Sequence, residues 1–309
     1  MSIIVSNISR KFGEQWAVNK VSFEIRSGEI VGFIGPNGAG KSTTMKIITG
    51  FLPPTSGQVL INDLDIREHP MEIKRIIGYL PEHNPLYQEM YVKEYLLYVA
   101  GMYGIRGAGA RKRVDEIIEQ VGLKKEQHKK IEKLSKGYKQ RVGISQALVH
   151  DPDVLILDEP TSGLDPNQII EIRNLISTVG REKTVLLSTH IMQEVEAICD
   201  RVIIIDRGEI KTDQSAELLG KDQQSGQTIE VELEAPFPPE QWKKLNVITD
   251  VRELPGNKYL LAAKSTMDIR SQIFKFAVEN NLTVLSMSQK HKKLEELFRE
   301  VTGKSGANR

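Results

Sequence analysis

A glycine-rich stretch that ends in a lysine and two hydroxyl residues is the part of the sequence with the clearest chemistry. Residues 35–43 read GPNGAGKST, which matches the pattern G-x-x-x-x-G-K-[ST], between an expected strand and an expected helix. Glycines let several backbone N–H groups converge on phosphate oxygens, and the start of a helix adds a partial positive charge. The stretch therefore predicts a phosphate-binding loop. The alternative is a glycine-rich turn that contains Lys-Ser by chance.

Each residue of this loop has an expected role toward a nucleoside triphosphate and its magnesium ion. Lys41 is expected to reach the β- and γ-phosphates and to assist catalysis, and the Ser42 hydroxyl to bind Mg²⁺. The residues expected to bind the nucleotide are Gly35, Pro36, Asn37, Gly38, Ala39, Gly40, Lys41, Ser42 and Thr43.

Two adjacent carboxylates, Asp158 and Glu159, follow the apolar run VLIL at the end of an expected buried strand. Ligands of parallel sheets gather at this edge, beside the phosphate loop. Asp158 is expected to hold Mg²⁺, through its water shell, and Glu159 to orient or deprotonate the attacking water. Without a nearby cation the two charges would repel each other. The alternative is an acidic pair that caps a helix.

His190 follows another apolar run, TVLLST, and is expected to contact the γ-phosphate as a third catalytic residue. Its alternative role is a structural hydrogen bond at a strand end. The remaining histidines have no metal-ligand spacing and are interpreted as surface or cap residues; they are His69, His83, His128, His150 and His291.

The elements that must position these residues alternate between apolar strands and helices. Strands are expected within 17–35, 153–160, 184–190 and 201–210, and helices at 166–180 and 191–200. This alternation indicates a mostly parallel sheet covered on both faces, with an antiparallel β part before it. Residues of about 83–150 have helical periodicity and predict an inserted helical subdomain. Together they predict a nucleotide-binding domain over residues 1–222.

Residues 223–309 predict a second, smaller domain. A polar stretch at 220–227 lacks periodicity, and the pattern after it reads strand, helix, strand, strand, helix, strand and a final helix at 294–303. The order βαββαβ is typical of a small α+β ferredoxin-like unit. In the last helix, Leu294, Leu297, Phe298 and Val301 form an apolar stripe.

Composition excludes some classes of function. The chain has 309 residues, a net charge of +1, 39% hydrophobic and 27% charged residues, so it has no broad basic field for nucleic acid. Its single cysteine, Cys199, fits a reducing compartment. The longest nearly apolar run, 95–105, is too short to span a bilayer, and the N-terminus lacks a signal-peptide pattern. A soluble protein that reaches a membrane only through a partner is expected.

The order of the motifs makes the sequence specific. GPNGAGKST, LSKGYKQR, VLILDEP, SGLD and STH resemble, in that order, the nucleotide-binding subunit of an ATP-binding-cassette (ABC) transporter over about residues 1–220. The family signature is usually L-S-G-G-Q; here Lys136 and Tyr138 replace its third and fifth residues, while Ser135 and Gly137 are retained. Taken alone, this segment would be equally typical of a serine-capped basic helix.

The resemblance implies an ABC-type P-loop fold and ATP hydrolysis with Mg²⁺. It implies a head-to-tail dimer in which Ser135 and Gly137 of one chain close over the ATP of the other, as a homodimer or a heterodimer. It places Phe12 against the adenine, with Trp16 as the weaker candidate; a core or edge-strand aromatic is the alternative. Asp165 would signal across the dimer.

One position departs from the family pattern. The loop after the expected strand at 75–81 normally supplies a metal-contacting glutamine, and this chain has Glu82. A carboxylate can still bind Mg²⁺, but it accepts hydrogen bonds and cannot donate them.

The resemblance also implies partners and a location. It is strongest to export-type ATPases, and among them to those of gliding motility. The expected partner is an integral membrane permease, which would hold the ATPase on the cytoplasmic, inner face of the cell membrane. No nucleic-acid partner is expected, because the one dense basic run, 123–133, is interpreted as a solvated face.

Two other functions fit less well. A non-transport ABC ATPase acting on ribosomes or DNA would usually carry two cassettes or long coiled coils, and neither is present. A regulatory module with weak hydrolysis would account for Glu82 and the altered signature.

Overall fold

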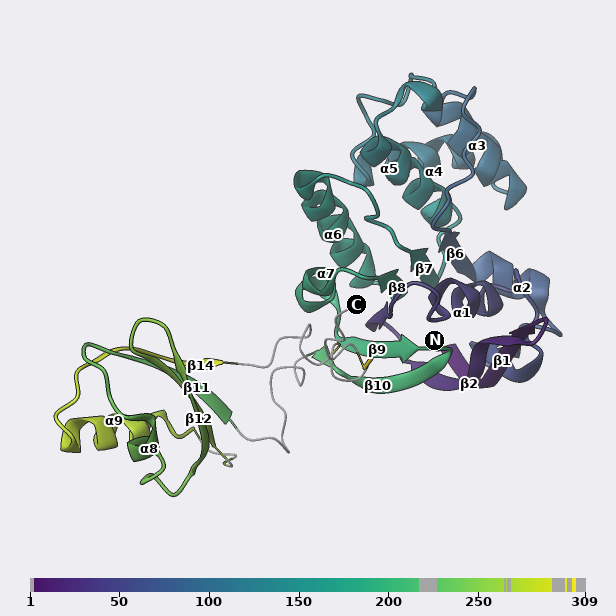
Figure 1. Ribbon diagram of the computed structural model, residues 1–309. Helices are drawn as coiled ribbons and strands as arrows, with labels where there is room; N and C mark the ends of the chain where they lie inside the picture. The colour runs from purple at the N-terminus through teal and green to yellow at the C-terminus, as the bar shows by residue number, and fades with distance from the viewer. Residues whose placement is uncertain are drawn as a thin grey trace. The chain divides into compact units, whose positions relative to one another are not determined.

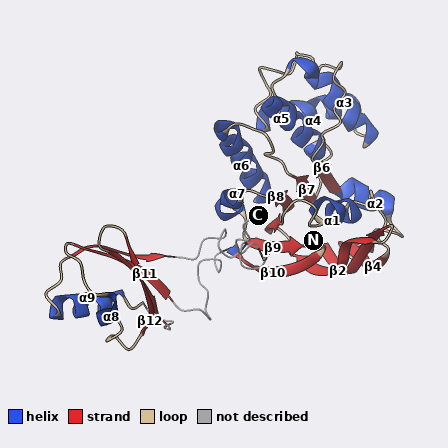
Figure 2. Cartoon of the chain, in the orientation of Figure 1, coloured by secondary structure: helices blue, strands red, loops and turns tan. Residues whose placement is uncertain are grey.

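The computed structural model describes residues 3–216, 227–263, 265, 268–290, 298 and 302–303. The chain divides into two compact units, Met1–Gln214 and Ser215–Arg309. Figure 1 labels the helices and strands of both units, and Figure 2 separates helices from strands by colour.

The first unit contains two sheets, one antiparallel and one mostly parallel. The antiparallel sheet has the order β2-β1-β4-β5, with β1 at Ile3–Phe12, β2 at Gln15–Ile25, β4 at Ser56–Ile61 and β5 at Leu64–Asp65. The second sheet has the order β10-β9-β3-β8-β7-β6, with β3 at Ile30–Ile34, β6 at Ile77–Leu80, β7 at Val154–Asp158, β8 at Thr184–Thr189, β9 at Arg201–Asp206 and β10 at Glu209–Ser215.

The order of the second sheet places the functional motifs side by side. Strands β3, β8 and β7 are neighbours, and every residue of the three is buried. Their apolar β-branched composition follows from this burial on both faces. Because the three strands are parallel, the loop after β3, the carboxylates at the end of β7 and the histidine after β8 lie at one edge.

Helices cover both faces of this sheet (Figure 2). The helices of the first unit are α1 at Lys41–Ile48, α2 at Pro70–Ile76, α3 at Val92–Met102, α4 at Gly107–Gln120, α5 at Lys136–Leu148, α6 at Pro166–Gly180 and α7 at Met192–Ile198, with a 3₁₀ turn at Ile131–Lys133. Met45, Ile47 and Ile48 of α1 share one buried core with residues of both sheets. The apolar face of α1 therefore fixes the helix directly behind the phosphate loop.

Helices α3, α4 and α5 form a separate group at the top of Figure 1. Each presents an apolar face of buried residues, such as Leu96 in α3, Val114 in α4 and Ile144 in α5. Helix α5 carries the signature segment at its first turn.

The second unit is a four-stranded antiparallel sheet with two helices. Its elements are β11 at Gln227–Leu233, α8 at Pro239–Trp242, β12 at Ile248–Leu254, β13 at Lys258–Ala263, α9 at Arg270–Glu279 and β14 at Val284–Lys290. The strand order β12-β13-β11-β14 places the third strand between the first and second, as in a split βαβ unit. Trp242 and Tyr259 are fully buried at its core.

The expected α/β fold with a ferredoxin-like second unit is confirmed. Some local expectations were incomplete: helix α2 was not predicted, and α8 ends at Trp242 although its pattern extended to Leu245. The polar stretch at 220–226 and nearly all of the final helix expected at 294–303 lie outside the described residues.

Candidate nucleotide-binding site

The phosphate loop encloses one side of a cavity of about 450 Å³. The residues that line it are Phe12, Gln15, Ala17, Asn37, Gly38, Ala39, Gly40, Lys41, Ser42, Thr43, Glu82 and Glu159. They come from the β1–β2 hairpin, the loop into α1, the segment after β6 and the end of β7. The cavity thus joins an aromatic side chain, a phosphate loop and two carboxylates.

The loop has the backbone shape that its glycines predict. Gly38 has φ 78° and Gly40 has φ 110°, values that residues with a side chain rarely adopt. A Cβ at Gly40 would lie 2.5 Å from the carbonyl oxygen of Ala17, and one at Gly35 would lie 2.3 Å from that of Ile205. Both positions therefore exclude larger residues, and Gly40 immediately precedes α1.

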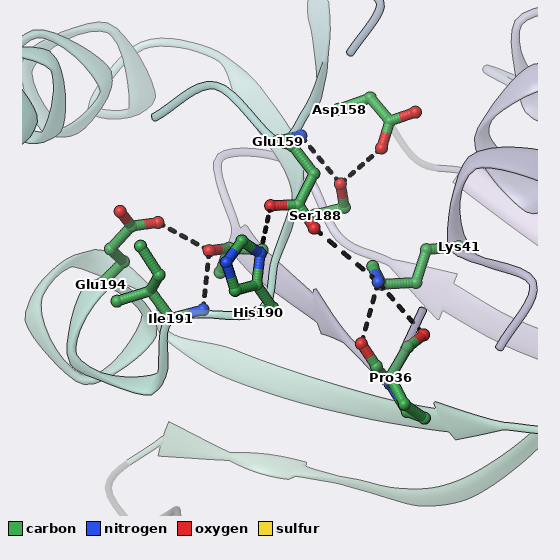
Figure 3. Close-up of polar contacts among 10 residues, drawn as sticks. Pro36, Lys41, Asp158, Glu159, Ser188, His190, Ile191 and Glu194 are labelled. Carbon is green, nitrogen blue, oxygen red and sulfur yellow. Dashed lines mark hydrogen bonds and ion pairs between the residues drawn. The ribbon is translucent and has the colours of Figure 1, made fainter. Parts of the chain in front are cut away.

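Lys41 is buried beneath the loop and its charge is already engaged. The Nζ donates to the carbonyl oxygen of Gly35 at 2.8 Å and to that of Pro36 at 3.4 Å, and lies 3.7 Å from Oε1 of Glu159 (Figure 3). Gly35 and Pro36 thus hold the lysine rather than line the cavity. The lysine also supplies a cation beside Glu159, which offsets part of the repulsion expected between this carboxylate and that of Asp158.

The two carboxylates at the end of β7, Asp158 and the following Glu159, have different surroundings. Asp158 is 1% exposed and accepts a hydrogen bond from the Ser188 hydroxyl at 2.6 Å. Glu159 has φ 51°, an uncommon conformation for a residue with a side chain. Its N–H donates to the Oγ of Ser188 at 2.9 Å, so one serine holds both residues (Figure 3).

His190 is not among the residues that line the cavity, but it contacts Glu159, which is one of them. Its Nδ1 lies 2.7 Å from Oε2 of Glu159, while its side chain is 57% exposed. Glu159 therefore lies between the imidazole on one side and Lys41 on the other, as Figure 3 shows. This arrangement suits a carboxylate that takes a proton from water next to a bound phosphate.

Two of the carboxylates expected to bind Mg²⁺, Asp158 and Glu82, lie near the buried hydroxyl of Tyr79. The hydroxyl of Tyr79 has no hydrogen-bond partner among the described residues. Burial raises the pKa of Tyr79 well above its usual value, and the nearby charges of Asp158 and Glu82 raise it further. Because Ser42 and Glu82 also line the cavity, the donor set fits a hard cation. Among the described residues, no group of three or more His, Cys, Asp or Glu side chains is placed to hold a metal ion.

The two aromatic residues expected near the adenine, Phe12 and Trp16, lie on different strands of the β1–β2 hairpin and differ in their relation to the cavity. Phe12 lines the cavity and is 50% exposed, whereas Trp16 is not among the lining residues. Trp16 lies opposite Lys11 in the register of β1 and β2, and the Lys11 ammonium sits 5.7 Å from its ring centroid. The cavity lining thus supports Phe12 over Trp16 as the adenine contact, and it includes two residues that were not predicted, Gln15 opposite Phe12 and Ala17.

Ser135 and Gly137 do not line this cavity. The Ser135 hydroxyl caps α5 by accepting the N–H of Tyr138 at 3.4 Å. A Cβ at Gly137 would come within 2.6 Å of the Gln168 side chain, which is in the first turn of α6. Asp165 caps α6 by accepting the N–H of Gln168. The signature segment and the SGLD loop are therefore neighbours, away from the cavity of the same chain.

The fold and the cavity together define a P-loop nucleotide-binding protein. The ABC transporter family profile matches residues 18–162. The chain is 36% identical over 313 residues to the linearmycin resistance ATP-binding protein LnrL of Bacillus subtilis (strain 168), covering 97% of both chains. It is 34% identical over 311 residues to the bacitracin transport ATP-binding protein BcrA of Bacillus licheniformis, covering 98% of both.

Solved structures agree with these relatives. An ATP-binding subunit of an ABC transporter matches with a TM-score of 0.64 and 33% identity, over 70% of this chain and 90% of that one. A dimeric ATP-binding cassette with bound ADP and Pi matches with a TM-score of 0.64 and 28% identity, over 69% and 98%. The chain therefore belongs to the ATP-binding subunits of ABC transporters, and it is an ATPase that binds ATP. These relatives give no support to the expected link with gliding motility.

Proposed function

We propose that this chain is the Mg²⁺–ATP-driven motor of an exporter, working as a head-to-tail dimer on a membrane permease. The observation that carries the proposal is the cavity, which gathers Phe12, the phosphate loop, Glu82 and Glu159 but leaves out Ser135 and Gly137. Phosphate ligands from the signature segment must then come from a second chain.

In this site each side chain has a separate task. Phe12 stacks on the adenine, and the loop N–H groups bind the phosphates. Lys41 moves from the carbonyl of Gly35 and from Glu159 to the β- and γ-phosphates, which frees Glu159 to accept a proton from the attacking water. His190 holds Glu159 in place and contacts the γ-phosphate.

Ser42, Asp158 and Glu82 are the proposed magnesium ligands, with Asp158 acting through bound water. A bound magnesium ion would neutralise charge on the β- and γ-phosphates. The Tyr79 hydroxyl, a buried donor near two of these carboxylates, would supply the hydrogen bond that Glu82 cannot donate.

The permease is proposed to dock on an exposed face at α3, made of Tyr98 and Met102 of the helix and of Tyr87 before it. Tyr87 is 52% and Met102 68% exposed, and the rings of Tyr87 and Tyr98 are 5.7 Å apart. Exposed aromatic side chains that touch one another are typical of protein interfaces. This face follows Glu82 closely in the chain, so docking can reach the cavity through that segment. Among the described residues no helix is long and apolar enough to cross a membrane, and such docking would hold the ATPase at the inner face of the membrane.

The proposed cargo is an antibiotic, because two of the relatives that match nearly the whole chain are named for linearmycin resistance and bacitracin transport. The test compares cells lacking this chain with cells carrying the wild type or Glu159→Gln, each grown in linearmycin or bacitracin. Loss of the chain should lower the inhibitory concentration of at least one compound, and only the wild type should restore it. Equal inhibition of all strains by both compounds would contradict the proposed cargo.

A further inference from the structure

Strand β8 ends in polar residues whose side chains point to opposite sides, as strand geometry requires. On one side, the Ser188 hydroxyl donates to Asp158, and the imidazole of His190 contacts Glu159. Thr189 lies between them in the chain and turns away, toward α7. The two sides have different partners, and only the first is part of the site described above.

The hydroxyl of Thr189 closes a turn around His190. It accepts the N–H of Ile191 at 3.0 Å and donates to Oε2 of Glu194 at 2.7 Å (Figure 3). A threonine hydroxyl bonded to the N–H two residues later fixes the backbone of the residue between them. His190 is that residue, and its exposed ring has one hydrogen bond to a described side chain, that of Glu159. The direction of the ring therefore depends on the turn.

Glu194 is a buried carboxylate with no assigned task. It is 2% exposed, and its second oxygen, Oε1, has no hydrogen-bond partner among the described residues. Burying a polar oxygen without a partner is unfavourable, and such groups are uncommon in folded proteins. An alanine or leucine would pack in α7 without this cost, so the carboxylate needs an explanation other than packing.

We propose that Glu194 is a positioning residue for ATP hydrolysis, which orients the Thr189 hydroxyl and thereby aims His190 at Glu159. The inference rests on the role of His190 in the proposed function. The chain of contacts runs from Glu194 through the hydroxyl of Thr189 to the N–H of Ile191, and from His190 to the carboxylate of Glu159. None of these contacts involves the phosphate loop, so we expect Glu194 to affect turnover far more than ATP binding.

The first test separates turnover from binding in purified full-length protein. Glu194→Ala should lower kcat by about 10- to 100-fold, the effect of a small misplacement of a catalytic group, with KM for ATP unchanged. Glu194→Gln should retain most of kcat, since its amide oxygen still accepts the hydrogen of Thr189. Thr189→Val removes the same hydroxyl at nearly the same volume and carries the test if Glu194→Ala does not fold.

A double-mutant cycle with His190→Ala decides whether Glu194 acts through the histidine. Adding Glu194→Ala or Thr189→Val to His190→Ala should cause no further fall in kcat. A second fall of the same size in that background would overturn the inference and leave the role of His190 standing. If His190→Ala alone hydrolysed ATP at the wild-type kcat, this result would contradict both the proposed role of His190 and the inference about Glu194.

Discussion

The two carboxylate oxygens of Glu159 contact different basic side chains. Its Oε1 faces the buried Lys41 at 3.7 Å, and its Oε2 faces His190 at 2.7 Å. The lysine thus pairs with the side chain that is proposed to accept a proton from water. In the proposed function a bound triphosphate competes for the lysine, so ATP binding and release of Glu159 would be one event.

Replacing Glu159 with glutamine tests this arrangement. The side chain keeps its size and its hydrogen-bond acceptor, but it cannot take a proton from water. We expect kcat for ATP hydrolysis to fall by about 10²- to 10⁴-fold, while the Kd for ATP stays the same or improves because Lys41 is freed. Lys41→Ala is the matched control and should weaken ATP binding itself. Unimpaired turnover by Glu159→Gln would contradict the proposed role.

The role of a residue could be predicted from the sequence when it followed from neighbouring residues in the chain. Residues 35–43 and the Asp158–Glu159 pair could be located from sequence, because each role follows from neighbours in the chain. Gln15 could not, because its contact with the cavity depends on hairpin register. The contact between Thr189 and Glu194 depends on how α7 turns back on β8. Polar residues directly after TVLL were the available signal for Ser188 and Thr189.

At the scale of elements, the junction between α5 and β6 involves His150, which the sequence predicted to be a surface or cap residue. It lies just after the end of α5 and is partly buried: its ring stacks on Tyr103 with 3.8 Å between ring centroids, and its Nε2 lies 3.0 Å from the carbonyl oxygen of Ile77. The Nε2 must donate in this contact. A second proton would therefore go to Nδ1, which is buried without a partner among the described residues. Burial lowers the pKa of His150, and the charges of Lys183 and Arg113 lower it further.

A stability difference with pH follows from this lowered pKa. As the pH falls, His150 takes up a proton in the unfolded chain before it does so in the folded chain, at its ordinary pKa of about 6.5. The contribution of His150 is therefore complete above that pH and is lost as the pH falls below it. Between about pH 7.5 and about pH 5.5, wild-type protein should lose more unfolding free energy in urea than His150→Gln, which keeps a donor for Ile77 and cannot titrate. Equal losses in both proteins would contradict this account.

Element boundaries were predictable where apolar pattern and end signals agreed. Helix α1 begins after Gly40 and is followed by Gly50 with φ 68°, and β7 and β8 cover their apolar runs. Helix α2 was missed because it is short and buries only Ile73, so it lacks an apolar stripe. In the second unit the strand order could be predicted only from the whole βαββαβ pattern, because no single strand indicates its neighbours in the sheet.

At the scale of the whole molecule, two anion-binding devices occupy different places in one chain. The phosphate loop opens into the cavity, whereas the signature segment at the start of α5 lies beside the SGLD loop and away from it. In the proposed function, one chain would therefore cover the nucleotide from one side only. In a head-to-tail pair, each copy would close the site of the other, so both the phosphate loop and the signature segment have a role in hydrolysis. A single-chain ATPase would explain the phosphate loop alone.

The most direct test of this account measures the oligomeric state and turnover of the same protein. Glu159→Gln with Mg²⁺ and ATP should sediment as a dimer and return to monomer without nucleotide, and Ser135→Arg in the same background should stay monomeric because its signature serine is blocked. Wild-type turnover per chain should fall as the protein is diluted below the dimer dissociation constant. A chain that remains monomeric with ATP at every concentration, with turnover per chain unchanged by dilution, would contradict the account.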